Sequence, residues 1–330
     1  MQLAAPNFLS FINGLTKETK ELYDNSVELN NDRQAYSKVA RVMDTNEINE
    51  KFVSTVRLSA PQKTPEGQNV GASDSFEGYT VIVSPHDKTT DSLTYSFEYE
   101  QGKRDDTQKI MKEYDADSKS MMWGLYNEIN VQFFELLNNG FASAWANATL
   151  SPDGEILFSA AHTFTADLPA TGNNVFDNLL PAVAPSLDVL DDVQERAGAF
   201  TDVGGRPMSL NPKIILVKRG GKAFREFSKI INPNRYAPTQ ITGPNGVNIY
   251  ELEYTLIECP FITSGTAYYI MEDYNNSILK NPLYLGFHQR PTIYGMEDRV
   301  DTLTHQTTYV SYYKTWVINI PIGLYGSEGA

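Results

Sequence analysis

Ser159 and His162 are the residues of this chain whose types and spacing come nearest to a catalytic pair. A serine hydroxyl becomes a nucleophile when a neighbouring histidine takes its proton. In α/β-hydrolases, however, that serine stands in a Gly-x-Ser-x-Gly turn after a strand. The stretch Leu157-Phe158-Ser159-Ala160-Ala161 has neither glycine. The pattern therefore favours a hydrogen-bonded structural histidine, and a hydrolase that uses Ser159 and His162 stays the less favoured alternative.

Two acidic side chains on one predicted helix face, Glu128 and Glu135, have the spacing of paired metal-binding carboxylates. Di-metal helix bundles also require a Glu-x-x-His pair, and the sequence has no histidine between His86 and His162. Cys259 is the only cysteine, which excludes a disulfide framework and a cysteine-based zinc site. We therefore expect two solvated glutamates and no metal site.

The run Lys218-Arg219-Gly220-Gly221-Lys222 resembles a phosphate-binding turn at the start of a helix. It departs from the phosphate-loop pattern because its first glycine is missing and Ala223 stands where serine or threonine is needed. A basic surface turn is the favoured interpretation. The sequence thus predicts no catalytic, cofactor-binding or metal-binding residue, and we expect neither an enzyme nor a cofactor.

The longest element that the sequence predicts is a helix from Asp105 to about Asn147. Its apolar positions recur every three, four or seven residues, which is the spacing of one helix face: Ile110, Tyr114, Met121, Leu125, Ile129, Phe133 and Leu136. Asp105 and Gln108 have the spacing of a capping box. At 1.5 Å per residue, about 40 residues form a rod of roughly 60 Å. We expect a spine on which other elements lie, with Phe133 and Leu136 buried.

The chain before this helix alternates between strand-like and turn-like stretches. Residues 1–50 are polar and predict either an arm that orders against a partner or a helix packed on its own domain. From Phe52 the apolar period becomes two, and the turn-rich stretch Pro61–Gly78 separates this strand from Val81–Val83. Residues 51–104 therefore predict a long hairpin. Because an isolated hairpin is marginal in water, it should lie on the spine or on a neighbouring subunit.

The chain after the helix predicts an α/β or α+β domain. A buried strand over Lys213–Lys218 has helices on either side of it in the sequence, and a long alternating strand stands near the end of the chain. The other predicted elements are helices over Phe176–Gln194 and Lys222–Ile231 and strands over Val247–Leu256, Ala267–Met271 and Thr307–Ile320.

The net charge of −14 is unevenly distributed. Residues 105–212 hold 5 basic and 16 acidic residues, a balance of −11. A protein that reads nucleic-acid sequence would carry a basic face, so that class is disfavoured. An acidic chain can still enclose nucleic acid without binding it tightly, because mutual repulsion leaves the nucleic acid free to slide. The beginning of the sequence lacks a basic and apolar leader, so we expect neither a signal peptide nor a membrane span.

Two oppositely charged segments follow one another in the second half of the chain. The first is acidic and holds Asp188, Asp191, Asp192 and Glu195, with Arg196 as its base. The second is basic and holds Lys213, Lys218, Arg219, Lys222, Arg225 and Lys229, with Glu226 as its acid. These segments can be solvated faces, can pair within one chain, or can join neighbouring copies in a head-to-tail ring.

Four stretches of the sequence stand out in their order: Tyr95–Tyr99 leading through Gly102 to Asp105-Asp106, then Asp153–His162, Gly205–Lys213 and Thr266–Ile270. Together they resemble the Mu-like major head subunit family of tailed-phage major capsid proteins. The resemblance covers roughly residues 90–330, and the order of the stretches is more specific than any one of them. The family's usual Val-Pro-Pro after the buried strand is replaced here by Val217-Lys218-Arg219.

The resemblance implies an α+β fold of the tailed-phage and herpesvirus major capsid type, with a long spine helix and an extended β-hairpin loop. It implies an N-terminal arm at residues 1–50 and the extended loop at 51–104. The peripheral domain would contain residues 105–172 with the spine and would be rejoined by residues 290–330. The axial domain would contain residues 173–289.

The function implied by the resemblance is self-assembly into an icosahedral phage head that encloses double-stranded DNA. The partners would be other copies of the chain, in hexamers and pentamers, and DNA held without sequence-specific contacts. Scaffold, portal and decoration proteins are further candidate partners, and no membrane is involved. The protein would belong to the virion and assemble in the cytoplasm of a bacterial host. The alternative is a bacterial nanocompartment shell of the same fold that packages protein cargo.

Overall fold

The computed structural model describes residues 35–47, 49–53, 78–83, 87–96, 107–142, 150–231, 253–275, 277, 279–299 and 304–330. The chain divides into two compact units. The first takes its described residues from Met1–Asn49, Ser84–Phe133 and Leu285–Thr315, and the second takes them from Glu50–Val83, Phe134–Tyr284 and Trp316–Ala330. Each unit therefore contains segments that are far apart in the sequence.

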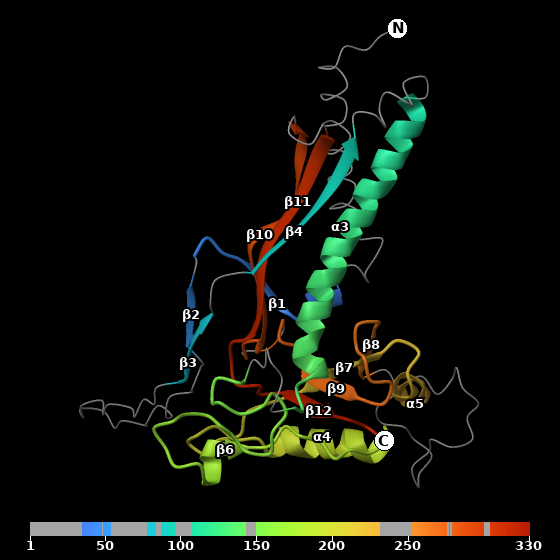
Figure 1. Cartoon of the computed structure of the whole chain (residues 1–330). Helices are drawn as coiled ribbons and strands as arrows, with labels where there is room; N and C mark the ends of the chain where they lie inside the picture. The colour runs from blue at the N-terminus through green and yellow to red at the C-terminus, as the bar shows by residue number, and fades with distance from the viewer. Residues whose placement is uncertain are drawn as a thin grey trace, which may run out of the picture. The chain divides into compact units, whose positions relative to one another are not determined.

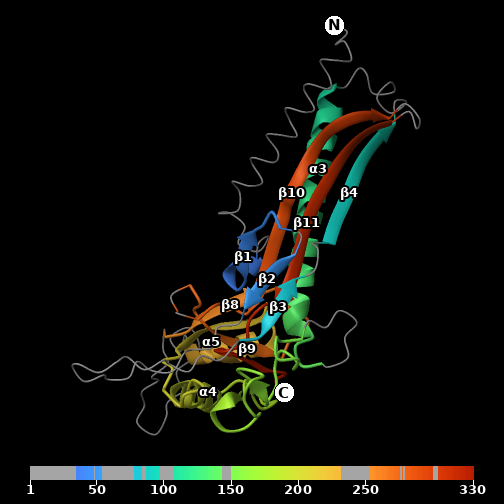
Figure 2. The same cartoon turned by 90° about the vertical axis from the view of Figure 1, so that its left-hand side faces the viewer.

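The first unit contains most of the long helix α3 (Thr107–Asn138) and a four-stranded sheet in the order β1-β10-β11-β4. The strands are β1 (Arg41–Asp44), β10 (Leu283–Arg299), β11 (Thr304–Val317) and β4 (Asp87–Ser96). The sheet lies along α3 in both views (Figures 1 and 2). The short helix η2 (Ala35–Lys38) is tied to α3, because the Tyr36 backbone N–H donates to Asn130 Oδ1 at 3.2 Å.

The helix α3 is shorter than the sequence predicted. It has 32 residues, which corresponds to about 48 Å, and it ends at Asn138. Gly140 explains the end: the Gly140 N–H bonds to the Leu137 carbonyl, and the Gly140 carbonyl accepts from the Phe158 N–H at 3.0 Å. The Phe158 N–H thus donates to a carbonyl that, in a longer helix, would accept a hydrogen bond from the helix's own backbone. The predicted cap Asp105 lies outside the described residues.

The predicted buried face of α3 is confirmed at its centre. Phe133 is fully buried and Leu136 is 6% exposed, whereas Val131 on the other side is 36% exposed. We expect Leu136→Ala to lower the free energy of unfolding of the unassembled subunit by about 2–5 kcal/mol, because the packed site cannot close around the cavity. Val131→Ala in the same helix should cost less than about 1 kcal/mol. Denaturant titration measures both values, and equal losses would contradict the assigned face.

The sequence missed β10, which is 17 residues long. Pro291 and two glycines, Gly286 and Gly295, interrupt its apolar alternation. Proline inside a strand normally argues against a central position, since it cannot donate to the ladder. The long strand β11 was predicted at 307–320 and is found at Thr304–Val317. It pairs antiparallel with β4, from Thr304 opposite Ser96 to Tyr313 opposite Asp87.

The second unit is built on a mixed sheet in the order β12-β9-β7-β8. The central strand β7 (Pro212–Lys218) pairs parallel with β8 (Thr255–Cys259) and antiparallel with β9 (Tyr268–Glu272). The edge strand β12 (Leu324–Ser327) pairs antiparallel with β9. Of the predicted strands, 247–256 falls partly outside the described residues, and the observed β8 begins at its end.

Two helices cover one face of this sheet. They are α4 (Leu187–Ala199) and α5 (Lys222–Ile231), and they share one apolar cluster with β7 and β9. The helix α5 has the predicted bounds. The prediction of a helix over Phe176–Gln194 is wrong in its first part, because Pro181 and Pro185 keep that stretch extended. The helix begins only after Ser186, whose side chain caps it by accepting from the Val189 N–H.

The remaining elements of the second unit are short. The base of the predicted hairpin is present, since β2 (Glu50–Val53) pairs antiparallel with β3 (Thr80–Val83), while its predicted turn-rich stretch lies outside the described residues. A second small ladder joins β5 (His162–Thr163) to β6 (Val175–Phe176), which follows η3 (Gly172–Asn174). The strand β4 lies within the predicted hairpin of residues 51–104 but belongs to the sheet of the first unit.

Candidate functional site

The imidazole of His162 is buried between two acceptors. Its Nδ1 lies 2.9 Å from Asp153 Oδ2, and its Nε2 lies 3.2 Å from the Leu157 carbonyl oxygen. Both contacts are hydrogen bonds only when each ring nitrogen carries a proton, because carboxylates and carbonyls only accept. The ring also stacks on Phe176 with centroids 5.2 Å apart. His162 therefore has the structural role that the sequence favoured.

Asp153 is the anionic partner in this buried pair. Burial raises its pKa, but the hydrogen bond from His162, the histidine charge and the N–H groups of Thr163 and Glu155 together more than offset burial. The pKa of Asp153 is therefore lowered from its ordinary value. The side chains of Asp153 and His162 have no solvent exposure, so the pair is screened little by salt.

Ser159 makes its hydrogen bonds elsewhere. Its Oγ donates to Glu155 Oε2 at 3.2 Å and accepts from the Ala161 N–H at 3.2 Å. Both nitrogens of His162 are meanwhile directed at other oxygens. A general base must reach the proton that it removes. The structure thus places Ser159 and His162 in one turn without forming the nucleophile–base contact that a hydrolase needs.

Asn178 is the residue that sequence reasoning missed in this region. Its Nδ2 donates to the carbonyls of Leu157 at 2.9 Å and Leu324 at 3.1 Å, and its Oδ1 accepts from the Ser159 N–H at 2.9 Å. The fully buried amide thereby joins the 157–159 turn to strand β12. Of the stretches that carry the family resemblance, Asp153–His162 contains this turn, but it does not contain Asn178.

At the other two candidate sites, Glu128 and the basic turn are in contact with groups of the protein itself. Glu128 is exposed and accepts from Gln132 Nε2 at 2.9 Å, one turn along the same helix. At the basic turn, the Ala223 N–H at the start of α5 donates to the Gly265 carbonyl at 3.1 Å. An added Cβ on Gly221 would lie 2.8 Å from that same oxygen, so protein backbone occupies the place of a phosphate. Within the described ranges, no group of three or more acidic, histidine or cysteine side chains could hold a metal ion.

The ladder of β2 and β3 has one packed face and one solvent face. On the packed face, the Phe52 ring lies 4.9 Å from the Tyr284 ring, and the Tyr284 hydroxyl donates to Glu50. On the other face, Val53 is 51% exposed and Ile82 is 61% exposed. Val53 and Ile82 are thus exposed apolar side chains on the solvent face of this ladder.

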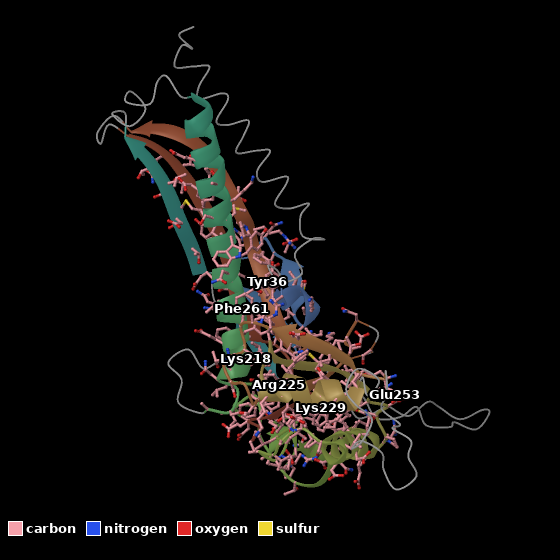
Figure 3. The ribbon with its side chains drawn as sticks, turned by 90° about the vertical axis from the view of Figure 1, so that its right-hand side faces the viewer. Tyr36, Lys218, Arg225, Lys229, Glu253 and Phe261 are labelled. Atoms are coloured by element: carbon pink, nitrogen blue, oxygen red, sulfur yellow. The ribbon has the colours of Figure 1, made fainter. Side chains whose placement is uncertain are left out.

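Opposite charges gather on the two helices that cover the second sheet. On α4, Asp188, Asp191 and Glu195 are exposed. On α5 and the turn before it, Arg219, Lys222 and Arg225 are exposed. Figure 3 labels Lys218 at the end of β7 and Arg225 and Lys229 on α5. In the part of the chain that the structure describes, no helix is long and apolar enough to cross a membrane.

The long helix, the long-stranded sheet and the mixed sheet are the elements of a fold that solved tailed-phage capsid structures share. A chain of the bacteriophage PhiM1 mature capsid matches with a TM-score of 0.50 and 13% identity over 89% of this chain and 86% of that chain. Two other similar structures are the capsid of an empty GTA particle (TM-score 0.49, 9% identity, 89% of each chain) and that of cyanophage P-SCSP1u (TM-score 0.48, 9% identity, 89% and 88%).

The likeness to the PhiM1 capsid chain confirms the predicted fold class. No family model matches the sequence, and no curated protein matches it either. The narrower resemblance to the Mu-like major head subunit family therefore stays a prediction, as do the boundaries of the arm, loop, peripheral and axial domains.

Proposed function

We propose that this chain is a structural shell protein, many copies of which assemble into an icosahedral phage head around double-stranded DNA. The observation that carries the proposal is the fold, which it shares with a mature phage capsid chain over 89% of its own length. The exposed Val53 and Ile82 at the base of the extended loop support it, since a solitary monomer gains nothing from exposing them. The protein would act without catalysis, cofactor or metal.

In this proposal the sequence regions have separate tasks. Residues 1–50 would form the arm, 51–104 the extended loop, 105–172 with 290–330 the peripheral domain, and 173–289 the axial domain. The compact second unit contains the described axial residues up to Tyr284 together with residues from both neighbouring peripheral segments. Subunits would meet as hexamers and pentamers in the virion, after assembly in the bacterial cytoplasm.

The charge balance bears on how such a shell would hold DNA. Residues 105–212 carry 5 basic and 16 acidic residues, a balance of −11. A surface of that charge repels the phosphate backbone, so the DNA would be confined by the shell and not bound to it. Scaffold, portal and decoration proteins would be further partners of the same shell.

Microscopy of the purified full chain tests this proposal. We expect negative staining to show closed shells of uniform diameter, or open rings that close when a crowding agent is added. A protein that stays monomeric by light scattering at every concentration, with and without the crowding agent, would overturn the proposal. Shells that retain a specific protein cargo and exclude DNA would instead identify a nanocompartment.

The extended loop provides a second test. Its stretch Pro61–Gly78 is rich in glycine, proline and polar residues and offers little to any core. Replacing Gln62–Ser75 with a Gly-Ser bridge of four residues should therefore leave a folded, helical monomer and abolish shells. Circular dichroism and electron microscopy measure the two effects, and a Gly-Ser segment of the full original length controls for chain connectivity. Normal shells from the shortened variant would rule out an assembly role for the loop.

A further inference from the structure

The solvent side of α3 carries a stripe of uncharged side chains around an exposed tryptophan. Trp123 is 51% exposed and Val131 is 36% exposed, although both stand well inside the helix. Side chains three and four positions apart lie on one side of a helix. Five uncharged residues follow that spacing here, and we call them the spine stripe: Ala116, Ser120, Trp123, Asn127 and Val131. Single exposed apolar side chains are ordinary on a protein surface, so the stripe gains meaning only from a segment that can cover it.

Gly124 leaves the backbone of α3 bare next to Trp123. Glycine inside a helix is destabilising relative to alanine. A Cβ added to Gly124 would meet nothing within 4 Å, so packing among the described residues does not require the glycine. A bare backbone would, however, let a second helix approach α3 closely, with the Trp123 side chain packed between the two.

The beginning of the sequence predicts a helix with an apolar face that needs such a surface. Residues 1–34 lie outside the described part of the chain. In the sequence, six apolar residues stand at i, i+3, i+4, i+7, i+14 and i+15: Phe8, Phe11, Ile12, Leu15, Leu22 and Tyr23. The residues between them are polar or glycine, apart from Leu9. This spacing predicts an amphipathic helix. A helix this short is marginal in water unless its apolar face is packed.

The described chain begins beside the stripe. Tyr36 in η2 is 1% exposed, and its backbone N–H donates to Asn130 Oδ1 of α3 at 3.2 Å; Figure 3 labels this tyrosine. Asn130 stands seven positions after Trp123, which is about two helical turns, so both project from nearly the same side of α3. The first 34 residues therefore join the described structure within about 10 Å along the helix axis from Trp123.

The lengths of the two elements match. A helix over residues 8–23 would be about 24 Å long, and the spine stripe from Ala116 to Val131 extends about 23 Å. The connecting residues 24–34 can span up to about 36 Å, enough to reach any position on the stripe. A segment attached this closely has an effective concentration on the order of millimolar, which favours its own subunit over a neighbour.

We propose that residues 8–23 form an amphipathic helix that packs its apolar face on the spine stripe of the same subunit. Trp123 is the central contact, and the small residues Ala116, Ser120 and Gly124 allow the two helices to approach. The contact lies within one chain and is therefore independent of the proposed shell function. It also decides between the two interpretations that the sequence left open for residues 1–50, because this part of the arm would be packed on its own domain.

Hydrogen exchange of the full chain, followed by mass spectrometry, tests the contact. We expect the amides of residues 8–23 to exchange at least about tenfold more slowly than in a synthetic peptide of residues 1–30. Trp123→Lys with Val131→Lys should return them to within about twofold of the peptide, because two charges then stand on the stripe. Both side chains are exposed, so far-UV circular dichroism should be unchanged. Glu128→Lys is the matched control, since it adds the same net charge on another side of the helix.

Cross-linking shows which chain supplies the helix. Thr19→Cys lies on the predicted apolar face and is combined with Asn127→Cys on the stripe; Lys17→Cys with Asn127→Cys places the first thiol on the polar face. The native Cys259 is buried and should not react. With a short bis-maleimide we expect the Thr19 pair to give a product of monomer mass and altered mobility on a denaturing gel. The Lys17 pair should give about tenfold less of it.

The outcomes are separate from those of the shell test. Exchange in residues 8–23 as fast as in the peptide would overturn the contact, whether or not shells form. Slow exchange that survives Trp123→Lys with Val131→Lys would overturn the spine stripe as the binding site. An equal effect of Glu128→Lys would assign the change to net charge and would also overturn it. Cross-links formed only between chains would show that a neighbouring copy supplies the helix, which contradicts the proposal.

Discussion

Replacing Phe158 with alanine is expected to lower the free energy of unfolding by about 3–5 kcal/mol. The ring is fully buried and stacks on Phe141 with centroids 4.7 Å apart and on Tyr269 at 5.5 Å. Such aromatic pairs contribute beyond the area that they bury. Phe158 thus connects the turn after α3 to strand β9 of the mixed sheet.

Two glycines make room for this ring. A Cβ added to Gly140 would lie 2.8 Å from the Phe158 ring, and one added to Gly326 would lie 2.5 Å from it. The backbone therefore approaches the ring from the helix end and from β12. Because backbone on both sides is held by its own hydrogen bonds, the site can collapse only partly when the ring is removed. The expected loss lies toward the upper end of the range for this reason.

Guanidinium denaturation of the unassembled subunit measures this loss. Leu150→Ala is the control, because Leu150 precedes the same turn and is 41% exposed. It should change the free energy of unfolding by less than about 0.5 kcal/mol. A Phe158→Ala loss below about 1 kcal/mol would show that the ring does not hold the helix end to the sheet.

The second large effect is expected at the buried Asp153–His162 pair. Asp153→Ala removes the acceptor of the His162 imidazole and of the Thr163 N–H, both at 2.9 Å. Removing one partner from a buried, hydrogen-bonded pair leaves the other unsatisfied, which costs about 3–5 kcal/mol near neutral pH. Glu155→Ala is the matched control, since Glu155 is an exposed carboxylate in the same turn. It should cost less than about 1 kcal/mol.

The effect of Asp153 should depend on pH with a defined sign. Its pKa in the folded protein is lowered, so the fold favours the ionised carboxylate. That stabilisation is complete above the unfolded pKa of about 3.9 and is lost as the pH falls through the lower folded value. The gap in unfolding free energy between the wild type and Asp153→Asn should therefore shrink as the pH falls below about 4. A gap that stays the same from about pH 5 to about pH 2 would contradict the assigned charge state.

The sequence alone was sufficient to predict which residues are buried wherever an apolar pattern repeats within one helix or strand. The central burial of Phe133 and Leu136 follows from a helical period that any window of α3 contains. The same holds for β7, α5 and most of β11, whose apolar positions are set by their own local alternation. The hydrolase alternative was disfavoured on equally local grounds, because the Gly-x-Ser-x-Gly pattern would place its glycines two residues before and after Ser159, and neither is present.

Tertiary structure decided where elements end and what they contact. The carbonyl of Gly140 is taken by Phe158, so α3 stops short of its predicted length. The Asn178 amide reaches Leu324, 146 positions away, and β4 pairs with β11 rather than within the predicted hairpin. No local period carries such information, because the partner of a hydrogen bond is chosen by the folded backbone and not by neighbouring residues. The charges on α4 and α5 can be read from the sequence, but only the fold shows which of them form ion pairs, as Arg196 does with Asp177 and Asp192.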